Sequence, residues 1–380
     1  MFQIPTMCTN GNFSMNGSND SFASFVGNGT CTRPTVDYPG IIMVAIFGLI
    51  CVIGLVGNGL VIFVILRYTK MKTVTNMYIL NLSIADTLFL LGLPLIMTTV
   101  ILKQWIFGYA MCKIFYILTC INTFTGAFTL TVMSGDRYFA VCFPITSMKY
   151  RTSKYASLAI AMTWLVSLLL MIPIFLYATK LESSPGRYSC SIQWPSMGII
   201  SPEKAFIYYT MLIGFVVPVL LISILYTLLV VRLRTTGPQV KSAEKRRSHR
   251  KVTKLVTMII VVYIFCWLPY WAFQLHLINS PAGRPMPKWK LIIYQCFTVL
   301  SYANSMVNPC LYAFTNENFR ESFINAFRCA ADPILSGRRC SEMGSTIGNN
   351  NMCGKKKVRS EVHAEYEFTT LATTMDGNGN

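Results

Sequence analysis

Seven long apolar stretches constrain this chain more than any other feature of its sequence. A helix needs roughly 20 mostly apolar residues to cross the hydrocarbon core of a bilayer. Only 13% of the 380 residues are charged, where soluble domains carry about a quarter. We therefore predict an all-α, seven-transmembrane helix bundle over residues 39–314. The predicted spans are Ile41–Leu66, Met77–Leu102, Ile114–Ser134, Tyr155–Thr179, Ala205–Val231, Leu255–Leu277 and Leu291–Phe314.

The placement of positive charge predicts the orientation of the bundle. With the N-terminus outside, 24 of the 33 lysines and arginines fall on the cytoplasmic side, as the positive-inside rule requires. The first 38 residues agree, because they are polar and carry four Asn-x-Ser/Thr sequons, which suit a lumenal segment. We predict a multi-pass plasma-membrane protein with a disordered, glycosylated extracellular N-terminus over residues 1–38. The sequons are at Asn12, Asn16, Asn19 and Asn28.

A short amphipathic helix is predicted to follow the seventh span, over residues 315–330. Phe319, Phe323 and Phe327 recur every four residues, which places them on one helical face against membrane lipid. Cys329 at its end is a candidate palmitoylation site. Residues 331–380 are polar and read as a flexible cytoplasmic tail.

Composition also excludes several classes of function. The net charge is +18, yet the cations sit at membrane boundaries, so nucleic acid is not an expected partner. Three scattered histidines and the lack of any CxxC pair argue against a metal site. We expect no cofactor and no enzymatic activity, since no nucleophile and base come together. A transporter is a remote alternative, because no inverted repeat is visible.

Polar residues inside the spans mark candidate functional positions, because ionisable groups are costly at membrane depth. Asp86 lies near the middle of the second span, where nearby asparagines could share a polar pocket with it or act as interhelical hydrogen-bonding groups. Asp136 and Arg137 meet at the cytoplasmic end of the third span. Cys112 and Cys190 both face the outer side, where a disulfide would tether the second outer loop.

Prolines are expected to kink several of the spans, since each removes a backbone hydrogen bond. Pro269 follows Cys266-Trp267-Leu268, and Pro309 lies within Asn308–Tyr312. Kinked helices with aromatic neighbours suit a switch.

Together these motifs resemble those of the rhodopsin-like (class A) G-protein-coupled receptors, in order and in spacing. The resemblance rests on Gly57-Asn58, the Asn81–Asp86 segment, Asp136-Arg137-Tyr138, Trp164, Pro218 with Tyr226, Cys266–Pro269 and Asn308–Tyr312. Three further segments resemble the somatostatin, opioid and insect allatostatin-C receptor group, and the insect type most. They are Tyr68–Thr73, Trp105–Gly108 and Tyr302–Ser305.

The resemblance implies a peptide ligand, a heterotrimeric G protein of the Gi/o class, and arrestin and receptor kinases as partners. It implies a ligand site lined by Thr119, Tyr270, Trp271, Gln274, Gln295 and Tyr302. The implied activation switch comprises Asp136, Arg137, Tyr138, Tyr226, Trp267, Pro269, Asn308, Pro309 and Tyr312. A candidate sodium site comprises Asp86, Asn122, Asn304 and Asn308.

Four positions depart from the patterns of related receptors. Somatostatin and opioid receptors pair a ligand cation with an Asp in span three, where this chain has Thr119. The absence of that acid favours an allatostatin-C-type peptide, with another neuropeptide of the group as the alternative. Gly126 replaces the serine of the sodium site, and Thr253 is the expected partner of Arg137 because span six begins without an acid. Tyr302 replaces the retinal-binding Lys of opsins.

Overall fold

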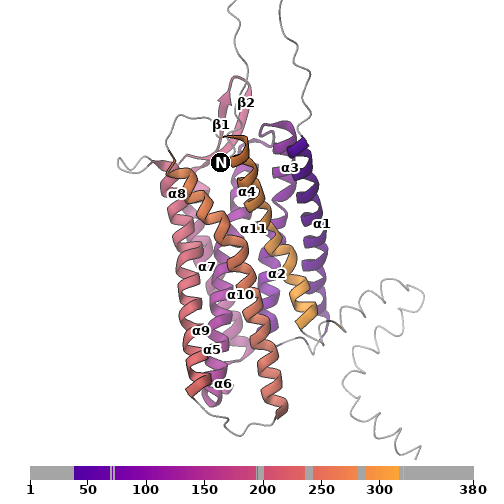
Figure 1. The fold of residues 1–380 in the computed structure, drawn as a ribbon, viewed down its shortest axis with the longest axis vertical. Coiled ribbons are helices and arrows are strands. Elements are labelled where there is room, and N and C mark those ends of the chain that lie inside the picture. Colours follow the sequence, from indigo (N-terminus) through magenta and orange to yellow (C-terminus); the bar gives the residue numbers. More distant parts are fainter. Residues whose placement is uncertain are drawn as a thin grey trace, which may run out of the picture.

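The protein is a bundle of long helices with a small hairpin at one end (Figure 1). The computed structural model describes residues 38–68, 71, 73–193, 195, 201–235, 243–280, 287–315 and 320. The four sequons, Cys329, the tail and all of the predicted amphipathic helix except Thr315 and Arg320 lie outside these residues. Two strands, β1 (Ala178–Ser184) and β2 (Arg187–Ile192), form the antiparallel hairpin. We call that end of the bundle the hairpin end.

Six of the seven predicted spans are confirmed as continuous helical stretches, among the described residues, that are long and apolar enough to cross a membrane. The first is α1 (Tyr38–Arg67), and the fourth is α7 (Ser153–Tyr177). The second consists of α2 (Val74–Leu90) and α3 (Leu93–Leu102). The regular α-helix is interrupted between them, because Pro94, at the start of α3, has no N–H to continue the helical hydrogen bonds.

The third and fifth spans each contain a short π-helical segment. In the third, η2 (Asn122–Gly126) joins α4 (Gly108–Ile121) to α5 (Ala127–Cys142). In the fifth, η3 (Leu212–Val216) joins α8 (Pro202–Met211) to α9 (Val217–Thr235). The two segments touch, and a Cβ on Gly214 would come within 2.5 Å of Thr123 Cγ2. Glycine is therefore required for this close approach of the two spans.

Two further long helices complete the bundle. The sixth span lies in α10 (Ala243–Ile278), and α11 (Lys288–Thr315) packs against both α10 and α1. The helix α11 carries polar residues along much of its length and is not among the six stretches that, within the described residues, are long and apolar enough to cross a membrane. A short helix, α6 (Pro144–Tyr150), follows the third span at the end opposite the hairpin, which we call the α6 end.

Three local expectations need correction. The fold is not purely helical, because the second outer loop forms the hairpin, and β1 takes Thr179 from the predicted fourth span. The short helix α6 was not expected. The third span begins at Gly108 rather than Ile114, so Lys113 lies inside a membrane helix. Hydropathy ends a span at a charge, whereas the backbone continues wherever that charge finds partners.

Candidate functional site

An aromatic cluster occupies the half of the bundle nearer the hairpin end. We define it as Trp267, Tyr270 and Trp271 of α10 with Tyr294 of α11. Trp267 stacks near Trp271 at 6.3 Å between ring centroids and meets Tyr270 edge-on at 5.8 Å. Tyr294 lies 6.4 Å from Tyr270. The ring spacings match those of favourable aromatic pairs, so the cluster forms a continuous wall between two helices.

Gln274 links the polar edges of this wall. Its Nε2 donates to the Tyr270 hydroxyl at 2.9 Å and to the Tyr294 hydroxyl at 3.4 Å. The indole N–H groups of Trp267 and Trp271 are buried and have no hydrogen-bond partner among the described residues. Buried donors are usually paired, so these two are available to a bound group.

Tyr302 forms a second group with Thr119 and Phe89. Its ring stacks flat on Phe89 at 4.1 Å, and its hydroxyl lies near the Thr119 side chain. The Thr119 hydroxyl also donates to the Phe115 carbonyl oxygen at 2.9 Å. The position where related receptors carry an acid is thus occupied by a neutral, internally bonded side chain.

The structure brings together five of the six residues expected to line the ligand site, in these two groups. Gln295 is half-buried and makes no hydrogen bond to another described residue. Sequence reasoning missed Tyr294 and Phe89. Tyr294 lies eight residues before Tyr302, about two helical turns away on the same face of α11, and that spacing was the available signal.

The hairpin is fastened to the top of the third span. Cys112 and Cys190 form the expected disulfide, with 5.5 Å between their Cα atoms. Lys180, which faces Cys190 across the hairpin, places its Nζ 3.5 Å from the centre of the Tyr188 ring. The backbone N–H of Trp105 donates to the Tyr188 carbonyl oxygen at 2.8 Å. Two separate segments therefore hold the hairpin over the aromatic cluster's end of the bundle.

Lys113 is a buried cation one residue below this disulfide. Only 9% of its surface is exposed. Its ammonium donates to the carbonyl oxygens of Phe175 and Leu176, the latter at 3.3 Å, and lies 4.8 Å from the centres of the Tyr109 and Phe175 rings. These carbonyls belong to the last turn of α7, where unpaired acceptors and the helix dipole favour a cation.

Asp86 lies at the centre of the bundle and is 1% exposed. Its Oδ1 accepts from Asn122 Nδ2 and from Ser305 Oγ, each at 2.7 Å, and its Oδ2 accepts from Asn308 Nδ2 at 2.8 Å. Asn304, the fourth residue expected here, makes no bond to Asp86. Ser305, which the sequence reasoning did not place at this site, does.

In this structure, donors rather than free oxygens face Asp86 at the candidate sodium site. A cation requires oxygen lone pairs, whereas the three groups nearest Asp86 present hydrogens to its carboxylate. A Cβ at Gly126 would make only an ordinary van der Waals contact there, 3.5 Å from Asn122 Oδ1.

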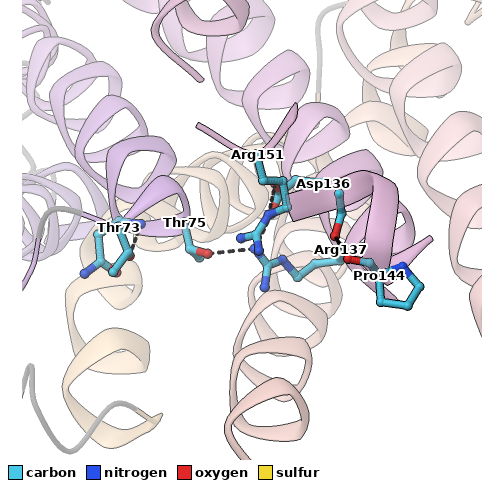
Figure 2. A network of polar contacts seen from close by, with 8 residues as sticks. Thr73, Thr75, Asp136, Arg137, Pro144 and Arg151 are labelled. Atoms are coloured by element: carbon cyan, nitrogen blue, oxygen red, sulfur yellow. Dashed lines mark hydrogen bonds and ion pairs between the residues drawn. The ribbon is translucent and has the colours of Figure 1, made fainter. Parts of the chain in front are cut away.

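An ion-pair network closes the α6 end of the third span (Figure 2). Asp136 pairs with its neighbour Arg137 and, through Oδ1, with Arg151 Nε at 2.7 Å. Arg137 Nη2 donates to Thr75 Oγ1 of α2 at 2.7 Å. The described residues show no bond from Arg137 to Thr253, so the partner expected on the sixth span is replaced by one on the second. Arg137 Nε is buried without a partner among them.

At three prolines within spans, the backbone carbonyl oxygen that loses its helical N–H donor accepts a hydrogen bond from a side chain of another span. Each proline removes the N–H that would bond the carbonyl four residues earlier. Asn58 Nδ2 donates to Ser305 O at 2.9 Å, four residues before Pro309. Similarly, the Tyr263 hydroxyl donates to Gly214 O at 3.2 Å, before Pro218, and Cys51 Sγ to Leu90 O at 3.8 Å, before Pro94.

Pro269 differs from these three prolines. The carbonyl four residues before it belongs to Phe265, and no side chain donates to that oxygen among the residues the structure describes. The sixth span is therefore not fastened to a neighbour at its proline, whereas the second, fifth and seventh helices of the bundle are.

The remaining switch residues lie in the half of the bundle nearer the α6 end. Tyr312 and Asn308 are 1% exposed, and the Pro309 ring lies 3.1 Å from the Cβ that a side chain at Gly57 would need. Tyr138 instead packs edge-on against Phe143 at 6.1 Å, beside α6. The structure therefore buries Asn308 and Tyr312 within the bundle, with Asn308 bonded to Asp86, and leaves Tyr138 beside Phe143.

Comparison with known proteins identifies the class. Residues 57–312 match the family model of the 7 transmembrane receptor (rhodopsin family). The chain belongs to this family of G-protein-coupled receptors and is a multi-pass membrane protein, which also confirms that it is not an enzyme.

Its similar relatives within the family are somatostatin receptors. The chain is 42% identical to somatostatin receptor type 2 of Sus scrofa over 314 residues, covering 82% of this chain and 83% of the relative. It is 42% identical to type 5 of Bos taurus over 308 residues, covering 81% and 80%. It is 39% identical to type 4 of Rattus norvegicus over 307 residues, covering 80% and 76%.

Proposed function

We propose that the protein is a plasma-membrane receptor for an extracellular peptide and that it signals through Gi/o proteins, with arrestin and receptor kinases ending the signal. The observation that carries the proposal is a buried aromatic cluster with unpaired indole N–H donors under a disulfide-anchored hairpin. In this proposal α11 is the seventh crossing, the hairpin end is extracellular, and the α6 end faces the cytoplasm.

The peptide is proposed to be of the allatostatin-C type rather than one with an essential buried cation. Thr119 is neutral, and its hydroxyl is already bonded to the Phe115 carbonyl oxygen. Lys113 nearby is positive, and Asp86 is bonded to three donors deeper in the bundle. A ligand ammonium beside Thr119 would lose its hydration without gaining a counter-charge, which costs several kcal/mol. A neutral or aromatic group suits the cluster better.

Activation is proposed to act through the sixth span. A ligand that bonds the indoles of Trp267 and Trp271 changes the packing directly beside Pro269. Because the carbonyl freed by Pro269 has no side-chain donor among the described residues, no interhelical bond holds α10 at the proline itself. A swing of the α6 end of α10 would open the bond from Tyr263 to the Gly214 carbonyl oxygen. The ligand shifts the balance between two states only through such differential contacts.

Two substitutions test the ligand assignment in cells that report G-protein activation, with and without pertussis toxin. Gln274→Ala removes the donor to Tyr270 and Tyr294, and we expect allatostatin-C-type potency to fall about tenfold, the effect of losing roughly 1.4 kcal/mol. Thr119→Asp should lower that potency and raise the potency of lysine-bearing somatostatin-type peptides. Thr119→Asn is the uncharged control.

If the receptor responds to neither the allatostatin-C-type nor the somatostatin-type peptides, the ligand proposal is overturned. Responses that persist in pertussis toxin would overturn the Gi/o proposal. Surface expression, measured by antibody against an N-terminal tag, separates a lost binding site from a receptor that does not reach the membrane.

A further inference from the structure

A cavity of about 220 Å³ lies at the α6 end, away from the aromatic cluster. Its walls come from α2, α5, α7, the last residue of α6 and the segment that joins α6 to α7. Most of the lining is apolar or aromatic, including Val74, Tyr78, Val132 and Ala156. None of the residues proposed to bind the peptide lines it.

Gly135 leaves space on the third-span side of this cavity. It lies inside α5, where a glycine costs about 0.5–1 kcal/mol relative to alanine. Gly135 lines the cavity, and a Cβ added there would meet no atom within 4 Å. Neither a positive φ nor a close helix contact accounts for this glycine. Its missing side chain leaves room for a bound group.

The polar end of the cavity is formed by the Asp136–Arg151 ion pair. Arg151 uses its Nε for Asp136, and its side chain remains 25% exposed. Its terminal NH2 groups make no hydrogen bond to another described residue, so they can bind an anion arriving from outside. Exposed Lys149 and Lys154 lie on either side of Arg151 in the sequence. Arg151 and both of these lysines are cationic.

The mouth of the cavity has the character of a membrane interface. Tyr150 and Tyr155 line the cavity, are 44% and 52% exposed, and meet edge-on at 5.7 Å. Tyrosine is favoured where headgroups meet hydrocarbon. In the proposed orientation, this mouth lies at the cytoplasmic leaflet, which carries the anionic lipids and attracts clustered Lys and Arg.

We propose that this cavity is a binding site for an anionic phospholipid of the inner leaflet. The lipid phosphate binds the free NH2 groups of Arg151 together with Lys149 and Lys154. An acyl chain lies along the apolar wall in the space that Gly135 leaves. A soluble anion would use the cations but not the apolar wall, and a zwitterionic lipid would use the wall but carry no net charge for the cations.

The test measures lipid binding to the purified full-length receptor by native mass spectrometry. Phosphatidylserine and phosphatidylcholine with identical acyl chains are titrated separately, with oleate and inorganic phosphate as further arms. Gly135→Leu fills the cavity. Gly59→Leu is the matched control, because Gly59 is an exposed helical glycine whose added Cβ also meets nothing within 4 Å.

We expect wild-type receptor to retain phosphatidylserine several-fold better than phosphatidylcholine. Gly135→Leu and Arg151→Gln should each reduce phosphatidylserine retention several-fold, and Gly59→Leu should leave it unchanged. Equal retention of the two lipids by the wild type, or wild-type retention in Gly135→Leu, overturns the proposal. So does tighter binding of oleate or phosphate than of phosphatidylserine. Where Gly135→Leu does not fold, an unchanged lipid preference in Arg151→Gln overturns the proposal alone.

Discussion

Lys113 and Arg137 are two buried cations near opposite ends of the same membrane span, and they are held in opposite ways. Lys113 binds two backbone carbonyls at the end of α7 and lies beside two aromatic rings. Arg137 is neutralised by its own neighbour and reaches one neutral hydroxyl, with Nε unpaired among the described residues. A fully bonded charge fastens two helices together, whereas a partly bonded charge can exchange its partner.

The largest effect is expected from Lys113→Met, which keeps the length of the side chain and removes its donors. Two backbone carbonyls of α7 would lose a charged partner, and hydrogen bonds to charged groups contribute about 1.5–3 kcal/mol. We expect a lower thermal transition of the purified receptor and reduced surface expression. Lys113→Arg retains donors and serves as the control. An unchanged transition in the Met variant would show that Lys113 does not fasten α4 to α7.

An intermediate effect is expected from Thr75→Val, which removes the hydroxyl that Arg137 binds and preserves its shape. Hydrogen bonds to charged groups contribute about 1.5–3 kcal/mol. If this bond holds the inactive state, basal G-protein activation should rise about tenfold or more, as measured by nucleotide exchange without ligand. Thr75→Ser keeps the hydroxyl and should behave as the wild type. Equal basal activity in the Val and Ser variants would contradict the role of this bond.

The smallest effect is expected at Asp86, a third buried charge, which is fully bonded like Lys113. Because three donors occupy its carboxylate, sodium should leave agonist affinity nearly unchanged in the wild type. Gly126→Ser adds an oxygen beside Asn122, where the structure has room for a Cβ at 3.5 Å. We expect a modest sodium dependence to appear in radioligand competition. Strong sodium dependence in the wild type would contradict the bonding of Asp86 described above.

The sequence predicted the helices well because membrane spans are determined by local composition. Hydropathy and charge bias located five spans within three residues at each end, and the third, predicted as Ile114–Ser134, extends over Gly108–Cys142. Asp86 and Arg137 stood out as charges at membrane depth. Lys113 was missed for the same reason, since a rule that ends a span at a charge cannot see the carbonyls that bind it.

The partners of the charged residues were harder to predict, because they are distant in sequence. Thr75 lies 62 residues from Arg137, and Ser305 lies 219 residues from Asp86. No periodicity relates such positions, so only the packing of helices identifies them. The cavity beside Gly135 is a still stronger case, because it is formed by five segments and by the absence of a side chain.

The π-helical segments η2 and η3 have a consequence for how the two halves of the molecule can vary. Each segment widens one turn, so the helix beyond it is rotated relative to an uninterrupted α-helix, by about 100° for one extra residue. The faces that α4 and α8 turn toward the bundle axis are therefore out of phase with those of α5 and α9. Deleting one residue from η2 would rotate α4 relative to α5. Every ligand-facing position of the third span, including Thr119, would then point in a different direction, while Arg137 would stay in place.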